Sequence, residues 1–119
     1  MNIIIDYIRD AGVLDKERIV FAVKSDEQIG KYLIAESNLL ENSRFSSKIK
    51  NIYWFPDQDV KAGDKVVLYT KQGSSNSVHN EDGSTTYFYY WGLNQAHLSG
   101  DKPCVVLFNA TWMVSAITQ

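Results

Sequence analysis

The sequence predicts an all-β protein, a sandwich or barrel of about eight short strands. Runs rich in Ile, Val, Tyr and Phe recur along the chain and end in Gly, Asn, Asp or Ser, the pattern of strands joined by turns. The 119 residues fit one domain spanning residues 1–119, and 45% hydrophobic residues are enough for a globular core. The expected strands cover residues 3–8, 18–24, 31–35, 52–55, 65–71, 85–91, 105–108 and 112–117.

Turn residues separate these runs. Asp10-Ala11-Gly12 and the segment 61–64 each put a glycine where a positive φ costs little. Asn109-Ala110 separates two apolar runs, so we expect it at the tip of the last hairpin. The polar segment 72–84 lies between two aromatic runs and is expected to form a long mobile loop.

Residues 26–41 fit two structures. Ser25 to Gln28 has the form of a capping box, and Ile29 and Leu33 follow near helical spacing, which favours one short helix. Gly30 opposes that helix, because glycine costs about 1 kcal/mol in a helix interior. We therefore expect a turn, a strand and a loop here, with the helix as the alternative.

Charge and cysteine content narrow the class of protein. A formal net charge of −2 argues against a protein that mainly binds polyanions. Cys104 is the one cysteine and lies in an apolar run, so we expect a buried side chain with no disulfide. The N-terminal run is interrupted by Asp6 and lacks a basic region, and no apolar stretch approaches the roughly 20 residues of a membrane span. We therefore expect a cytoplasmic protein without membrane contact.

The sequence predicts no catalytic, metal-binding or cofactor-binding residues. His79, His97 and Cys104 lack the spacing of a metal site. The sequence also has no nucleophile elbow and no glycine-rich phosphate loop followed by Lys. A hydrolase whose residues meet only in space remains a third and weaker hypothesis.

Aromatic residues are densest in the segment 87–91. In a strand, Tyr87, Tyr89 and Trp91 share one face, while Phe88 and Tyr90 share the other. Packing in the core is the simpler interpretation of the first face. The alternative is an exposed aromatic platform that binds a protein, a sugar or a single-stranded nucleic acid.

Basic residues concentrate in one short stretch, which holds Arg44, Lys48 and Lys50. A solvated loop is the simpler interpretation, because Lys and Arg are normal surface residues. The alternative is a small patch that contacts nucleic acid.

Several short motifs follow one another in the second half of the chain. Tyr53-Trp54-Phe55-Pro56 is an aromatic strand end, and the segment 60–69 combines a glycine turn with a Val-rich run. A Trp-containing segment, 91–94, and a Val-Leu run, 105–108, come next. In this order the motifs resemble those of the lamin tail domain family, and upstream the segment 30–34 is similar to that family's Gly-Trp-x-Leu strand, with Tyr32 in place of Trp.

The resemblance implies an immunoglobulin-like β-sandwich that serves as an interaction module and shares no catalytic residues. We therefore expect a non-catalytic binding or structural module whose partner is another protein. A homo-oligomer fits the same expectation. The alternative function is a nucleic-acid-binding module that uses the basic stretch and an aromatic face.

Overall fold

The protein is built almost entirely of strands. The computed structural model describes residues 1–96, 98 and 102–117, and within them the chain forms ten strands and two short 3₁₀ helices. The strands are β1 (Ile3–Arg9), β2 (Arg18–Val23), β3 (Glu27–Gln28), β4 (Tyr32–Asn38), β5 (Ile52–Trp54), β6 (Asp59–Val60), β7 (Lys65–Tyr69), β8 (Asn76–His79), β9 (Thr85–Tyr90) and β10 (Pro103–Asn109); the 3₁₀ helices are η1 (Ile29–Lys31) and η2 (Glu41–Ser43). The predicted all-β class is confirmed.

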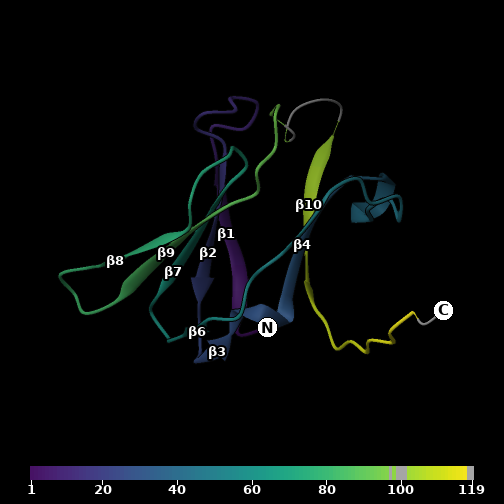
Figure 1. Ribbon diagram of the computed structural model, residues 1–119. Coiled ribbons are helices and arrows are strands. Elements are labelled where there is room, and N and C mark those ends of the chain that lie inside the picture. The colour runs from purple at the N-terminus through teal and green to yellow at the C-terminus, as the bar shows by residue number, and fades with distance from the viewer. Residues whose placement is uncertain (97, 99–101, 118–119) are drawn as a thin grey trace.

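Two sheets face each other as in a sandwich (Figure 1). The larger has the order β1-β2-β7-β9-β8, the smaller has the order β10-β4-β5, and the short pair β3-β6 lies at one end. All pairings are antiparallel except that of β7 with β9. The chain passes from β7 to the outer strand β8 and returns as β9 between them.

Aromatic rings join the two sheets in the core. Phe55 follows β5 in the small-sheet half of the core, and its ring centroid lies 5.5 Å from those of Phe21 on β2 and Tyr89 on β9, both in the large sheet. Edge-to-face arrangements of this kind are favourable beyond the area that they bury. Ile34 on β4 and Leu68 on β7 are fully buried in the same cluster.

A buried carboxylate fixes one end of the large sheet. Glu17 is completely buried and accepts hydrogen bonds from the Gly12 amide (2.7 Å), the Thr70 hydroxyl (2.8 Å) and the Leu98 amide (3.1 Å). These donors belong to three separate loops. One side chain therefore connects the β1–β2 turn, the end of β7 and the segment that leads to β10.

Residues 26–41 follow the expected turn and strand, and of the alternative helix only the three-residue 3₁₀ helix η1 is formed. The Gln28 side chain caps the start of the three-residue η1 by accepting a hydrogen bond from the Gly30 amide. Tyr32 then takes up an extended conformation and begins β4.

The prediction of a mobile loop over residues 72–84 is wrong for the centre of that segment. Residues 76–79 form β8, which pairs with β9 as a hairpin, and His79 lies on this strand opposite Thr85. All four residues of β8 are exposed. Its polar composition is that of an edge strand exposed to water, which explains why the sequence pattern did not show it.

The prediction of a last strand over residues 112–117 is also wrong. Asn109 ends β10 rather than forming a hairpin tip, and residues 110–117 form neither helix nor strand. β10 pairs with β4, so these residues have no role as its hairpin partner. An apolar segment is thereby left in solvent.

No helix in the described part of the chain has the length and apolar character that a membrane crossing needs.

Candidate protein-interaction surface

The three predicted aromatic residues of the β9 region face the core. Tyr89 is 5% exposed and belongs to the core cluster, and the partly buried rings of Tyr87 and Trp91 pack against it. The Trp91 and Tyr53 ring centroids are 6.2 Å apart. Burial raises the pKa of Tyr89 to about 12. This face of β9 therefore serves core packing and presents little area to a partner.

The opposite face of β9 carries a cation–aromatic stack. Tyr90 stacks on Tyr69 at 5.5 Å, and the charged groups of Arg18 and Lys71 lie 5.7 and 4.9 Å from the Tyr69 ring centroid. The backbone of Gly73 approaches the Tyr90 ring so closely that a Cβ there would lie 2.4 Å from it. The aromatic surfaces of this stack are therefore largely used within the chain.

The predicted basic residues belong to a connection within the small sheet, whereas β9 belongs to the large sheet. Arg44, Lys48 and Lys50 are all exposed in the segment between β4 and β5. Its fold is fixed by a bridge between Leu39 and Phe45 and by further hydrogen bonds to the end of β4. The structure does not bring the basic and aromatic candidates together into one site.

The outer side of the small sheet is apolar, which sequence reasoning missed. Ile34, Tyr53 and Leu107 pack against the core. Their sequence neighbours therefore point to the other side, because side chains alternate along a strand. The strand register aligns them in rows across β10, β4 and β5. We call this surface the apolar face; it consists of Leu33, Ala35, Ile52, Trp54, Cys104, Val106 and Phe108.

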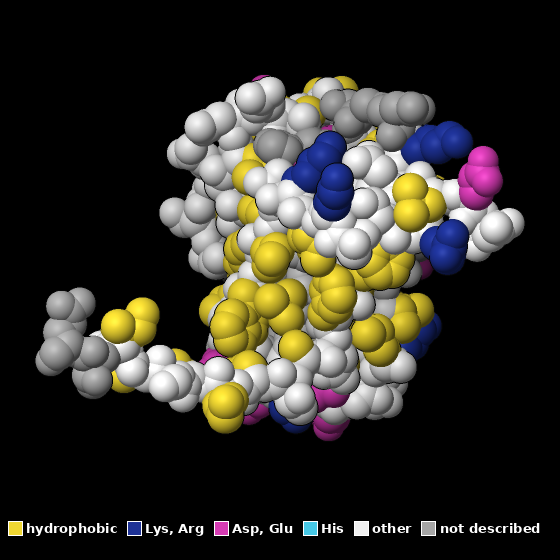
Figure 2. Space-filling view, turned by 90° about the vertical axis from the view of Figure 1, so that its right-hand side faces the viewer, with side chains coloured by type: hydrophobic (Ala, Val, Ile, Leu, Met, Phe, Trp, Pro, Cys, Tyr) yellow, Lys and Arg dark blue, Asp and Glu magenta, His cyan; other side chains and the backbone are white. Residues whose placement is uncertain are grey.

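The apolar face contains a hollow of about 220 Å³. Every residue that lines it is apolar: Leu33, Ala35, Ile49, Ile52, Phe108 and Ala110. Ile52 is 57% exposed and Trp54 is 48% exposed. Figure 2 shows hydrophobic side chains gathered across the middle of this side of the molecule, with Lys and Arg side chains above them. An apolar area with a polar rim is typical of a protein-binding surface.

Trp54 is held at the edge of this face by a hydrogen bond. Its indole N–H donates to the carbonyl of Gly30 at 2.7 Å. Gly30 itself lies directly against Asp57, where a Cβ would be 2.1 Å from Asp57 Oδ1 and 3.0 Å from its Cα. The indole is thus oriented although nearly half of its residue surface is exposed.

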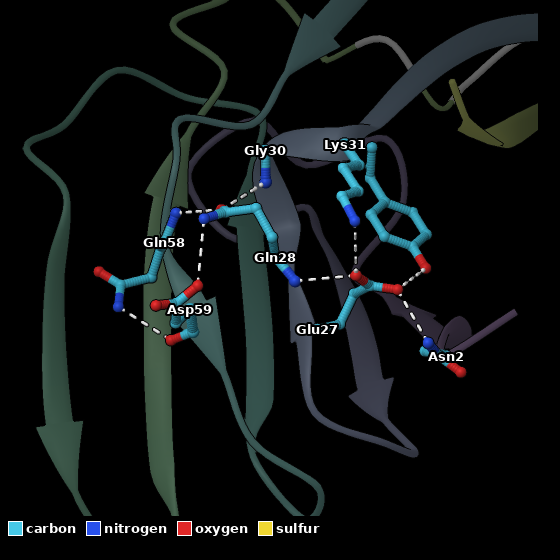
Figure 3. A network of polar contacts seen from close by, with 8 residues as sticks. Asn2, Glu27, Gln28, Gly30, Lys31, Gln58 and Asp59 are labelled. Atoms are coloured by element: carbon cyan, nitrogen blue, oxygen red, sulfur yellow. Dashed lines mark hydrogen bonds and ion pairs between the residues drawn. The ribbon is translucent and has the colours of Figure 1, made fainter. Parts of the chain in front are cut away.

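A polar network fixes the η1 turn (Figure 3). The Gln28 side-chain oxygen accepts from the amides of Gly30 and Gln58, and its side-chain nitrogen donates to Asp59 Oδ1 at 3.2 Å. Gln28 therefore joins η1 to the chain that enters β6.

Glu27 connects the same network to the N-terminal end of β1. Its carboxylate accepts from the Gln28 amide (2.9 Å), the Asn2 side chain (2.9 Å) and the Tyr32 hydroxyl (3.2 Å), and Lys31 Nζ lies 3.7 Å away. The Gln28 amide, followed by Asn2, lowers the pKa of Glu27. Burial, with Glu27 nearby, raises the pKa of Tyr32.

Cys104 is only half buried, which corrects the prediction of a buried core residue. Alternation along β10 puts it on the apolar face with Val106 and Phe108. Burial raises the pKa of its thiol, which disfavours the reactive thiolate.

Aspartates in the large-sheet half of the molecule accept hydrogen bonds from nearby backbone amides. A second hollow, about 450 Å³, is lined in part by Asp59, Asp64 and Asp82. Asp64 accepts from the Lys61 and Thr85 amides, and Asp82 accepts from the amide and hydroxyl of Ser84. Among the described residues, no three His, Cys, Asp or Glu side chains gather as metal ligands would. His97 lies outside the described residues.

No protein-family model matches the chain, and no curated protein matches it either. The lamin tail resemblance therefore rests on the sequence motifs alone.

Proposed function

We propose that the chain is a non-catalytic module that binds another protein through the apolar face. The observation that supports this most strongly is the exposure of Ile52 and Trp54 beside a hollow with an entirely apolar lining. Covering apolar surface is favourable by about 25 cal/mol per Å². A partner that buries this face therefore gains free energy without having to remove water from charged groups.

The position of Trp54 supports the same proposal. Tryptophan is enriched among residues that dominate binding energy at interfaces. The bond to Gly30 restrains the ring before any partner arrives, so less side-chain entropy is lost on binding.

The fold is compatible with this role. A sandwich of the lamin tail type is an interaction fold, and we propose that relationship on the motifs given above. We also propose a cytoplasmic location, for which the free thiol of Cys104 is the support, since unpaired cysteines are usual in reducing compartments.

Affinity capture with variants of the face tests this function. Ile52→Arg puts a charge on the edge strand β5, and Val78→Arg is the matched control on β8, the edge strand of the other sheet. We expect the wild-type chain and Val78→Arg to retain the same proteins, including untagged copies of the chain, and Ile52→Arg to lose them. Equal capture by all three would contradict the proposed role of the face.

A further inference from the structure

The chain carries a second apolar surface, an extended segment that leaves the sandwich after β10. We call residues 110–117 the apolar arm. Its large side chains are highly exposed: Trp112 65%, Met113 92%, Val114 79% and Ile117 92%. Figure 2 shows this segment extending away from the body of the protein. The segment 109–119, which includes the arm, contains no charged residue.

The path of the arm begins on the apolar face. The Ala110 amide donates to the Lys31 carbonyl at 2.9 Å, just before β4, and Ala110 lines the hollow. Trp112 then packs edge-on against Trp54 of β5, with ring centroids 5.6 Å apart. The arm thus crosses the end of the small sheet, and its first aromatic residue already contacts the face.

After its contact with Trp54 the arm projects away from the sandwich (Figure 1). Turning back onto its own face would take about four residues in a turn. Of the described arm, this leaves only Ile117 to cover the hollow. Met113 and Val114 therefore lie where they can contact another molecule.

From these observations we propose that the apolar face of one copy binds the apolar arm of a second copy. This inference rests on the proposed function and names its partner. Residues 113–117 extend over roughly 16 Å at about 3.3 Å per residue, which exceeds the roughly 10 Å between the outer strands of a three-stranded sheet. One arm is therefore long enough to cross the whole face.

Reciprocal exchange favours a second copy over an unrelated partner. Each chain supplies one face and one arm, so a two-fold symmetric dimer forms the same contact twice and covers both arms at once. Both surfaces are apolar, so no unpaired charge is buried in the contact.

Sedimentation velocity over a range of protein concentrations tests this arrangement. The arm variant replaces Trp112, Met113, Val114 and Ile117 with Ser; the face variant is Ile52→Arg; the control is Val78→Arg. All substituted residues are exposed, so the sandwich is expected to fold in each variant. We expect dimers for the wild type and the control, and monomers for the arm variant and the face variant.

Mixing the two monomeric variants provides the decisive result. The arm variant keeps an intact face and the face variant keeps an intact arm, so together they form one of the two contacts. We expect a heterodimer that dissociates at a higher concentration than the wild-type dimer. A wild-type chain that stays monomeric, a dimer that survives the arm substitutions, or a mixture without heterodimer would overturn the proposal.

The same variants separate this inference from the proposed function. If the wild type is monomeric but still captures other proteins in a manner that Ile52→Arg abolishes, arm exchange is wrong and the proposed function stands. If neither self-association nor capture depends on Ile52, both are wrong.

Discussion

The indole N–H of Trp54 donates a 2.7 Å hydrogen bond to the carbonyl of Gly30, across 24 residues of sequence. This bond connects the apolar face to the η1 turn, which the network of Gln28 and Glu27 holds in place. The geometry of the exposed surface therefore depends on polar contacts at the end of the sandwich.

Gly30→Ala is expected to destabilise the protein by about 1–3 kcal/mol, the usual cost of overpacking. The added Cβ would meet Asp57 Oδ1 at 2.1 Å and Asp57 Cα at 3.0 Å. Adding Asp57→Ala should restore part of the loss, because it removes the first contact and leaves the second. Urea denaturation measures both effects. An unchanged midpoint for Gly30→Ala would show that the turn is not tightly packed.

Glu17→Ala is expected to cost about 3 kcal/mol or more, because it removes an acceptor from three donors and each buried donor left unsatisfied costs roughly 1–3 kcal/mol. Thr70→Val deletes only one of these donors and should cost less. The free energy of unfolding, measured in urea, gives the comparison. An equal loss for the two variants would contradict the anchoring role of the carboxylate.

Glu27 gives the protein a stability that depends on pH. The pKa of Glu27 is lower in the folded state than in the unfolded state. Its contribution to stability is therefore complete above the unfolded-state pKa and is lost as the pH falls from the unfolded-state pKa to the folded-state pKa. Glu27→Gln should therefore lower stability by about 1.5–2 kcal/mol at neutral pH, the lower part of the range for hydrogen bonds to a charged group. The difference should shrink as the solution is acidified below about pH 4.

Denaturation at several pH values measures this difference. Glu41→Gln is the control, because Glu41 is an exposed glutamate on η2. A difference for Glu27→Gln that stays constant with pH would contradict the role of the carboxylate charge.

Nucleic-acid binding by the basic stretch should be undetectable at micromolar protein. Arg44, Lys48 and Lys50 offer three phosphate contacts on a chain with a net charge of −2. Three contacts lose roughly 20- to 40-fold in affinity between about 50 and 200 mM salt. Fluorescence anisotropy with single- and double-stranded oligonucleotides tests this at two salt concentrations. Submicromolar binding that disappears when all three residues are changed to Ala would favour the nucleic-acid alternative.

Much of the strand content could be predicted from the sequence. Seven of the eight expected runs contain strands, from Ile3–Arg9 to Pro103–Asn109, because local apolar patterning follows strand geometry directly. The expected order of turns and strand after Ser25 also agrees with the structure. β8 was missed because three of its four residues are polar, and residues 112–117 were wrongly expected to be a strand because they are mostly apolar yet unpaired.

The candidate surface could not be predicted in the same way. The runs 31–35, 52–55 and 105–108 are apolar at consecutive positions, which fits strands buried on both sides. Only the register of Leu33 with Trp54 and Phe108 shows that one side aligns into a continuous surface. Register depends on contacts between distant segments, which the pattern of one sequence does not contain. The same limit applies to Tyr87, Tyr89 and Trp91, whose shared face was predicted but whose burial was left open.

The most direct test of the central claim is whether the apolar face binds the arm segment as a separate peptide. A fluorescently labelled peptide of residues 110–117 is titrated with the arm variant, whose face is free of competing arms. We predict saturable binding that Ile52→Arg, added to that variant, abolishes and that Val78→Arg leaves unchanged. Absence of saturable binding, or binding that Ile52→Arg does not affect, would contradict the claim.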